Sequence, residues 1–163
     1  MFLHFSSIMI QRIQTIWFFL ASVAFFALFL FAYVHYSDNG MAKALKVTGA
    51  YENVNGQVVQ TEPFLGLTIV TVLIAIIPLV AIFLFKERKK QIALAYITIV
   101  AILGYFFWMY KITREVIGDF QLQPENYGIG IFLPSIAILF LIFAIKGIRK
   151  DENLIRSTDR LRG

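Results

Sequence analysis

Four stretches of this chain contain no Lys, Arg, Asp or Glu and are long enough to cross a bilayer as helices. They are residues 13–36, 64–85, 92–110 and 127–145. A helix needs about 20 apolar residues to cross a hydrocarbon core about 30 Å thick. These stretches lack the polar–apolar alternation of membrane-barrel strands. The sequence therefore predicts an all-α membrane protein, a four-transmembrane-helix bundle forming a single integral membrane domain over residues 1–163.

The composition excludes several other classes of protein. Of the 163 residues, 59% are hydrophobic and only 15% are charged, whereas a soluble domain has about 45–50% apolar and about 25% charged residues. A domain of this size has too little interior to bury so much apolar surface. A soluble enzyme, a disordered tail and a nucleic-acid-binding domain are therefore excluded. Since the chain has no cysteine, it has no disulfide, thiol nucleophile or cysteine-ligated zinc.

The distribution of Lys and Arg predicts the orientation. Eleven of the fifteen lie in the N-terminal tail, the 86–91 link and the 146–163 tail, and four lie in the other two connections. Because cytoplasmic loops are enriched in Lys and Arg, we expect a multi-pass protein of the bacterial inner membrane with both termini in the cytoplasm. Its basic clusters would contact anionic lipid headgroups.

The first outer loop, residues 37–63, contains one signal for local structure and one for processing. Asn55-Gly56 between residues 50–54 and 57–60 predicts a small β-hairpin, because this dipeptide favours a type I′ turn. Ala42-Lys43-Ala44 has the form of a signal-peptide cleavage site. The preceding apolar run is longer than the usual 7–15 residues, so we expect the first span to be retained as an anchor.

Two stripes of small residues and prolines predict helix-packing faces. Small residues let helices approach closely in lipid. The stripes, in the second and fourth spans, consist of Thr68, Thr71, Ala75, Pro78 and Ala81, and of Gly130, Pro134, Ala137, Leu141 and Ala144. We expect Pro78 and Pro134 to kink or locally break their helices.

Signals for chemistry are sparse. The spans contain no charged residue, and the only titratable candidate is His35 near Asp38. There is no nucleophile elbow, phosphate-binding loop or metal-ligand spacing. Gly128-Ile129-Gly130 lacks the rest of a dinucleotide motif, and we expect it to loosen the start of the fourth span. The sequence thus predicts a protein that is not an enzyme and has no catalytic residue, cofactor or metal.

The C-terminal tail is the densest polar segment. It favours either a basic amphipathic end lying on the inner leaflet or a docking site for a cytoplasmic partner. In both cases Glu152 and Arg156 form an i, i+4 ion pair. The candidate docking residues are Arg149, Lys150, Asp151, Glu152, Arg156, Asp159 and Arg160.

Both ends of the chain resemble a known family. The segments are residues 9–15, Phe132-Leu133-Pro134 and the tail motifs Ile148-Arg149-Lys150-Asp151-Glu152, Ile155-Arg156-Ser157 and Asp159-Arg160-Leu161-Arg162. Together they resemble the bacterial membrane family called domain-of-unknown-function family 4293. The resemblance implies a small four-span membrane protein with no catalytic residues to transfer. Members of this family begin at the position of Met9, so we expect residues 1–8 to be an upstream extension.

Three functions remain open at this point. The first is a non-enzymatic structural or interaction subunit that forms a homo-oligomer or binds a membrane-protein partner. The second is an oligomeric channel or transporter component with a polar path along Thr68, Thr71 and Thr98. The third is a lipid-modifying enzyme at the outer face that uses His35, Asp38 and carboxylates of the outer loops.

Overall fold

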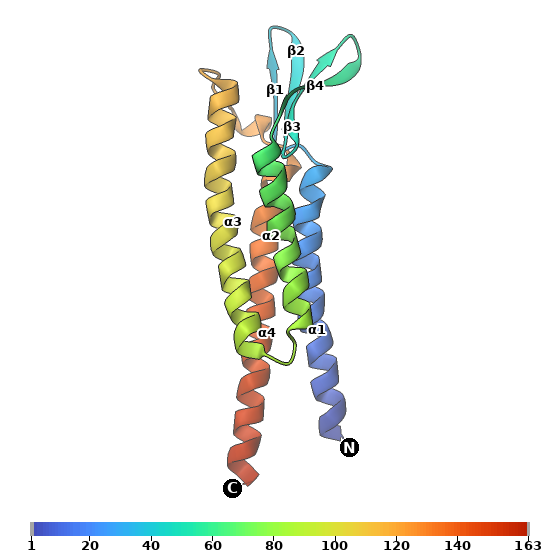
Figure 1. Ribbon diagram of the computed structural model, residues 1–163, viewed down its shortest axis with the longest axis vertical. Helices are drawn as coiled ribbons and strands as arrows, with labels where there is room; N and C mark the ends of the chain where they lie inside the picture. The colour runs from blue at the N-terminus through green and yellow to red at the C-terminus, as the bar shows by residue number, and fades with distance from the viewer. Residues whose placement is uncertain (1, 163) are drawn as a thin grey trace.

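The computed structural model describes the backbone of residues 2–162 and the side chains of residues 13–157 (Figure 1). It contains four long helices, a four-stranded antiparallel sheet and three short 3₁₀ turns. In chain order these elements are α1 Phe2–Phe26, η1 Ala27–Phe29, β1 Val34–Asp38, β2 Met41–Lys46, β3 Gly49–Val54, β4 Gln57–Pro63, α2 Leu65–Phe83, α3 Arg88–Ile117, η2 Pro124–Asn126, η3 Ile129–Ile131 and α4 Leu133–Arg162.

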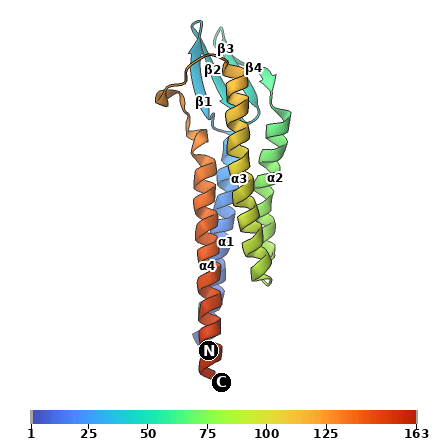
Figure 2. The same cartoon turned by 90° about the vertical axis from the view of Figure 1, so that its left-hand side faces the viewer.

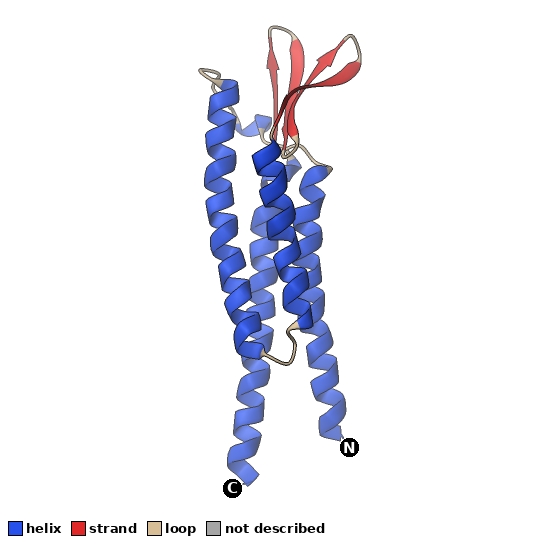
Figure 3. Ribbon diagram, in the orientation of Figure 1, coloured by secondary structure: helices blue, strands red, loops and turns tan. Residues whose placement is uncertain are grey.

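The molecule is elongated and has two different ends. The helices lie side by side, the sheet stands at one end, and both ends of the chain lie at the other (Figures 1 and 2). We call these the sheet end and the terminal end. α1 packs against α2 and α4, while α3 packs against α2 and α4 and closes the ring of four helices. Figure 3 shows that the strands are confined to the sheet end.

Three helices are long and apolar enough to cross a membrane, as a membrane protein requires. They are Leu65–Phe83, Arg88–Ile117 and Ile129–Ser157. In the part of α1 whose side chains are described, the apolar helix Ile13–Phe29 is shorter than these. Four spans were predicted, and three of them meet this criterion within the described part of the chain.

The predicted fold class is wrong in one respect: the chain is not all-α with one small hairpin. The hairpin of β3 and β4 exists, with its turn at Asn55-Gly56, but it pairs with a second hairpin of β1 and β2. That hairpin turns at Asn39-Gly40, where both residues have positive φ, 51° and 79°. This is again the dipeptide of a type I′ turn. Residues 34–36 had been assigned to the first span because they are uncharged, but they form the start of β1.

The two predicted packing stripes are confirmed. In α2, Thr71, Ala75, Pro78 and Ala81 are buried, and Thr68 is half-buried. The five stripe residues of the fourth span, from Gly130 to Ala144, are all buried. Small side chains on these faces let the helices approach closely. Larger buried side chains fill the remaining space, among them Phe18, Phe25, Leu28, Ile102 and Tyr105.

The two prolines occupy different positions. Pro78 lies inside α2, which continues through it as a single helix. Pro134 is the second residue of α4, and the first turn of a helix tolerates proline because its N–H groups have no intrahelical acceptor. The prediction of a break at Pro134 is therefore wrong, since the proline lies where the helix begins.

Candidate functional site

The β1 edge of the sheet is tied to the segment that leads into α4. Val34 forms an isolated antiparallel bridge with Tyr127, and the Asn126 Nδ2 donates a hydrogen bond to the His35 carbonyl oxygen at 3.0 Å. Tyr36 stacks obliquely on Phe120, with the ring centroids 5.4 Å apart. One edge of the sheet is therefore covered by the chain itself.

Gly128 and Gly130 make this covering possible. Their N–H groups donate hydrogen bonds to the carbonyl oxygens of Tyr33 and Ala32, at 3.0 and 3.1 Å. A Cβ at Gly128 would overlap the Ala32 carbonyl oxygen, and one at Gly130 would lie 2.8 Å from it. The expectation that these glycines loosen the start of the fourth span is wrong. They allow a close approach between two backbones that fixes the start of α4 against the segment between η1 and β1.

The β4 edge is bare by comparison. β4 is the last strand of the sheet and pairs only with β3. All of its residues are exposed, and Val58 and Val59 are 71% and 46% exposed. Edge strands of natural proteins are commonly protected by charges, bulges or a covering segment. Residues 57–61 carry no charge, and the register shift between β3 and β4 lies at Ala50 and Tyr51, near the base of the hairpin.

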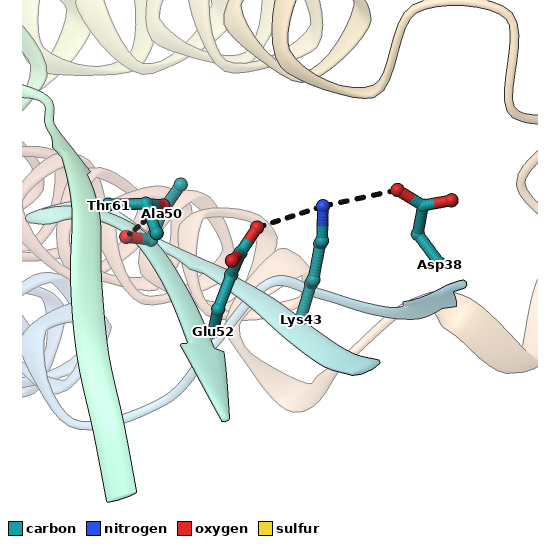
Figure 4. A network of polar contacts seen from close by, with 5 residues as sticks. All are labelled: Asp38, Lys43, Ala50, Glu52 and Thr61. Carbon is teal, nitrogen blue, oxygen red and sulfur yellow. Dashed lines mark hydrogen bonds and ion pairs between the residues drawn. The ribbon is translucent and has the colours of Figure 1, made fainter. Parts of the chain in front are cut away.

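A charged network crosses one face of the sheet. The Lys43 Nζ lies 3.1 Å from the Asp38 Oδ2 and 2.8 Å from the Glu52 Oε1 (Figure 4). The Thr61 hydroxyl donates to the Ala50 carbonyl oxygen in the neighbouring pair of strands. Contacts with Glu52 and Asp38 raise the pKa of Lys43 above its usual value, because both carboxylates favour the charged ammonium. This network connects the two hairpins through β1, β2 and β3.

The structure does not bring His35 and Asp38 together as a catalytic pair. Successive side chains of a strand point to opposite faces, and these two residues of β1 are three positions apart. Asp38 shares its face with Lys43, while His35 pairs with Ala44 on the other face. Within the described part of the chain, no group of three His, Asp or Glu residues is placed to hold a metal ion.

The three threonines of the possible polar path are engaged in local hydrogen bonds. The Thr71 and Tyr105 hydroxyls are 2.6 Å apart and link α2 to α3. The Thr68 hydroxyl donates to the Val47 carbonyl oxygen, and the Thr98 hydroxyl to that of Leu94.

Among the predicted docking residues of the tail whose side chains are described, Asp151 is buried and the others are at least partly exposed. α4 continues through the tail without interruption, so the tail extends a long helix and is not a separate one. The predicted pair of Glu152 and Arg156 is confirmed, at 2.8 Å. Lys150 and Arg149 are exposed, and Arg149 donates to the Tyr96 hydroxyl at 2.8 Å. The side chains of Asp159 and Arg160 lie outside the described residues.

Asp151 differs from the other tail residues because it faces inward. It is 4% exposed, and its Oδ2 lies 2.9 Å from the Arg88 guanidinium at the start of α3. Nearby, the Gln91 Nε2 donates to the Ala81 carbonyl oxygen at 3.0 Å. Asp151 therefore connects α4 to α3 at the terminal end and is not available on the tail surface. Sequence reasoning missed this pair because nothing in the spacing of Arg88 and Asp151 indicates that they meet.

A cavity of about 590 Å³ lies at the sheet end of α3. Its walls come from α3, from the Tyr33–Val34 segment and from the residues between α3 and α4. Apolar side chains such as Phe106 and Met109 line it, and so do Thr113 and Arg114. Sequence reasoning did not predict this cavity, because its walls come from three separate segments.

The buried Tyr33 hydroxyl is an unusual feature of this cavity wall. Tyr33 is 1% exposed, and its hydroxyl forms no hydrogen bond of good geometry. Burial raises the pKa of Tyr33 to about 12, and the neighbouring Thr113 side chain opposes part of the shift. A buried hydroxyl without a partner is costly, so an acceptor arriving in the cavity would stabilise it.

Together these features define a class of protein: helices of membrane-spanning length that carry a folded antiparallel sheet at one end. The chain belongs to the family described as Domain of unknown function (DUF4293), which matches residues 10–161. Searches of the curated proteins and of the solved structures find no match to this chain. The resemblance noted from the terminal motifs is thus confirmed over nearly the whole sequence.

Proposed function

We propose that this protein is a non-enzymatic subunit of the bacterial inner membrane that binds a partner protein along the free edge of its sheet. All four helices would cross the membrane, with both chain ends in the cytoplasm and the sheet on the outer side. The excess of Lys and Arg in the terminal segments and the 86–91 link supports this orientation. So does the position of both chain ends opposite the sheet (Figure 1).

The bare β4 edge is the observation that carries this proposal. Its unpaired N–H and C=O groups can hydrogen-bond an added strand, and the exposed Val58 and Val59 offer apolar contacts. The other edge is already occupied by Tyr127 and Asn126. An extended segment would thus add beside β4 as a fifth strand.

The direction of β4 argues for a different protein as the partner, in preference to a second copy. β4 runs from the tip of the sheet back to the start of α2 (Figure 1). Two copies inserted the same way in the membrane are related by an axis along the membrane normal. A two-fold axis in that direction keeps the two β4 strands parallel. It also places each N–H of one strand opposite the same N–H of the other copy, so the two strands cannot hydrogen-bond. Antiparallel pairing would require opposite insertion.

Pairing of β4 with β1 of a second copy would be antiparallel, but β1 is not free to accept it. The bridge from Val34 to Tyr127 and the bond from Asn126 to the His35 carbonyl oxygen occupy that edge. The occupant we propose is therefore an extended segment of another protein that runs outward from the membrane, antiparallel to β4.

Site-specific crosslinking tests this proposal. A photo-reactive amino acid at Val58, on β4, should give one product heavier than the chain and different in mass from a multiple of 18.7 kDa. The matched control is the same amino acid at Met41, an exposed residue of β2, which should not give that product. Products that are only multiples of the chain mass, or a monomer alone in several mild detergents, would contradict the proposal.

Proline substitutions make the test specific to the strand edge. Adjacent residues of a strand direct their N–H groups to opposite sides, so one of Val58 and Val59 donates toward β3 and the other toward solvent. For this test the photo-reactive amino acid is moved to Gln57, the exposed first residue of β4. We expect the proline at the outward-donating position to abolish the crosslink from Gln57 while the protein keeps its fold by circular dichroism. If both folded proline variants still crosslinked like the wild type, pairing along β4 would be excluded.

A further inference from the structure

We propose that the cavity at the sheet end of α3 binds one anionic phospholipid of the surrounding leaflet. Its phosphate would lie near Arg114 and Tyr33, and an acyl chain would lie against Phe106 and Met109. This inference concerns a different surface from the β4 edge and does not depend on a partner protein.

The position of the cavity along α3 favours an amphipathic ligand. Phe106, Met109 and Tyr110 belong to the uncharged stretch 92–110, and Lys111 is the first charged residue after it. Thr113 and Arg114 lie beyond Lys111, toward the sheet. The cavity thus crosses the level at which the apolar part of the helix gives way to its polar part. A lipid changes from hydrocarbon to headgroup over the same boundary.

The apolar part of the cavity wall suits an acyl chain. Met109 is 3% exposed, and Phe106, Leu122 and Ile131 are partly buried and pack against the core. All four line the cavity. Its volume of about 590 Å³ lies within the usual range for small-molecule sites, about 300–1,000 Å³. Such a space between apolar walls beside the membrane favours an apolar chain over water.

The upper part suits an anion. Arg114 is the only Lys or Arg among the residues that line the cavity, and none of them is acidic. No carboxylate among the described side chains forms an ion pair with Arg114, whereas its neighbour Lys111 lies 3.6 Å from Glu115. A guanidinium group binds phosphate through charge-assisted hydrogen bonds.

Tyr33 supplies the second, independent observation. Its hydroxyl is buried and lacks a hydrogen bond of good geometry, and Tyr33 and Thr113 both line the cavity. A phosphate oxygen near Arg114 would give the hydroxyl an acceptor. A neutral apolar ligand would leave the buried hydroxyl without that acceptor, which is unfavourable, and would gain nothing from the guanidinium of Arg114, an exposed residue.

Native mass spectrometry of the full chain in mild detergent tests the site. The protein is titrated with phosphatidylglycerol and, separately, with phosphatidylcholine that carries identical acyl chains. We expect one tightly bound phosphatidylglycerol and at least about tenfold weaker binding of phosphatidylcholine, because a charge-assisted contact is the difference between them. Equal affinity for the two lipids, or no retained lipid, would overturn the proposal.

Three variants locate the bound lipid. Arg114→Gln removes the headgroup contact and should weaken phosphatidylglycerol binding about tenfold. Leu122→Trp, at a connecting segment, fills the apolar part and should weaken binding of both lipids. The matched control is Lys111→Gln, which removes one positive charge from the same helix outside the cavity wall and should leave the affinity unchanged. If Arg114→Gln and Lys111→Gln lost the same affinity for phosphatidylglycerol, general charge attraction would explain the binding and the proposed site would be wrong.

Inorganic phosphate distinguishes a lipid site from a simple anion site. We expect phosphate at the concentration of the lipid to leave lipid binding unchanged, since it lacks the chain that occupies the apolar part. If phosphate alone displaced the lipid at equal concentration, the proposed role of the acyl chain would be wrong.

Discussion

The two edges of the sheet are made from the same kind of hairpin but have different surroundings. β1 and β4 each belong to a hairpin closed by Asn-Gly with positive φ at both residues. The base of the first hairpin is buried, with Val34 and Leu45 at 1% and 0% exposure, and the segment before α4 covers its edge. β4 is exposed along its whole length. The covered edge has a structural role, and the bare edge remains available for binding.

The largest expected difference between the two edges comes from truncating one buried and one exposed side chain. Leu45→Ala, at the covered base, should lower the free energy of unfolding by about 2–5 kcal/mol, since it leaves a cavity in a packed region. Val59→Ala, on β4, should change it by less than about 0.5 kcal/mol. Chemical unfolding in mild detergent measures both values. Similar losses for the two variants would mean that β4 is packed as tightly as the covered edge.

A smaller effect is expected from adding one methyl group where the covered edge meets the start of α4. Gly128→Ala forces a Cβ against the Ala32 carbonyl oxygen and should destabilise the protein by about 1–3 kcal/mol. Gly104→Ala in α3 is the matched control, because a Cβ there meets nothing within 4 Å. Thermal unfolding followed by circular dichroism compares the two variants. If Gly128→Ala melted at the wild-type temperature, the close approach would have no importance for stability.

The charged network between the hairpins should contribute less to the free energy of unfolding than the close approach at Gly128. Lys43→Met leaves Asp38 and Glu52 without their shared cation, but these groups are partly exposed, at 44% and 24%. We expect a loss below about 1 kcal/mol, which decreases further at high salt. Lys46→Met is the control. It removes a positive charge from the same strand, but this ammonium lies over the Tyr51 ring, 5.7 Å from its centroid, and not between two carboxylates. A loss that did not change with salt would indicate a packing effect of the Lys43 side chain.

Tyr33→Phe should change the unfolding temperature least at neutral pH, and its effect should appear only at alkaline pH. The pKa of Tyr33 is raised from 10.0 to about 12 in the folded protein. The unfolded chain therefore ionises first, and the contribution of Tyr33 is complete below pH 10 and falls between pH 10 and 12. The unfolding temperature of the wild type should decline more steeply over this range than that of Tyr33→Phe. Parallel curves would show that Tyr33 ionises as it does in the unfolded chain.

Much of the helical part could be predicted from the sequence. The stripe from Thr68 to Ala81 marked the buried face of α2, because small residues at helical spacing leave few other arrangements in lipid. The turn at Asn55-Gly56 was also predicted. The same dipeptide at Asn39-Gly40 was an available signal for the second hairpin, but the uncharged residues before it made the strand resemble the end of a helix.

The candidate sites were predictable to a smaller extent. Glu152 and Arg156 were paired correctly because they lie one helical turn apart on the same helix. Asp151 was placed on the tail surface, yet it pairs with Arg88 on another helix. The cavity beside Arg114 was not predicted at all. Interactions between neighbours on one helix follow from its geometry, whereas contacts between elements depend on how these elements pack.

The sequence by itself determined that apolar helices form, because uncharged stretches of membrane-spanning length have few alternatives in lipid. It also determined their small-residue packing faces. Only the tertiary structure decided where α1 ends, which edge of the sheet is covered and which groups surround the cavity. A short uncharged segment such as residues 34–36 can continue a helix or form a strand. Its state depends on hydrogen-bond partners that lie far away in the chain, here Leu45 and Tyr127.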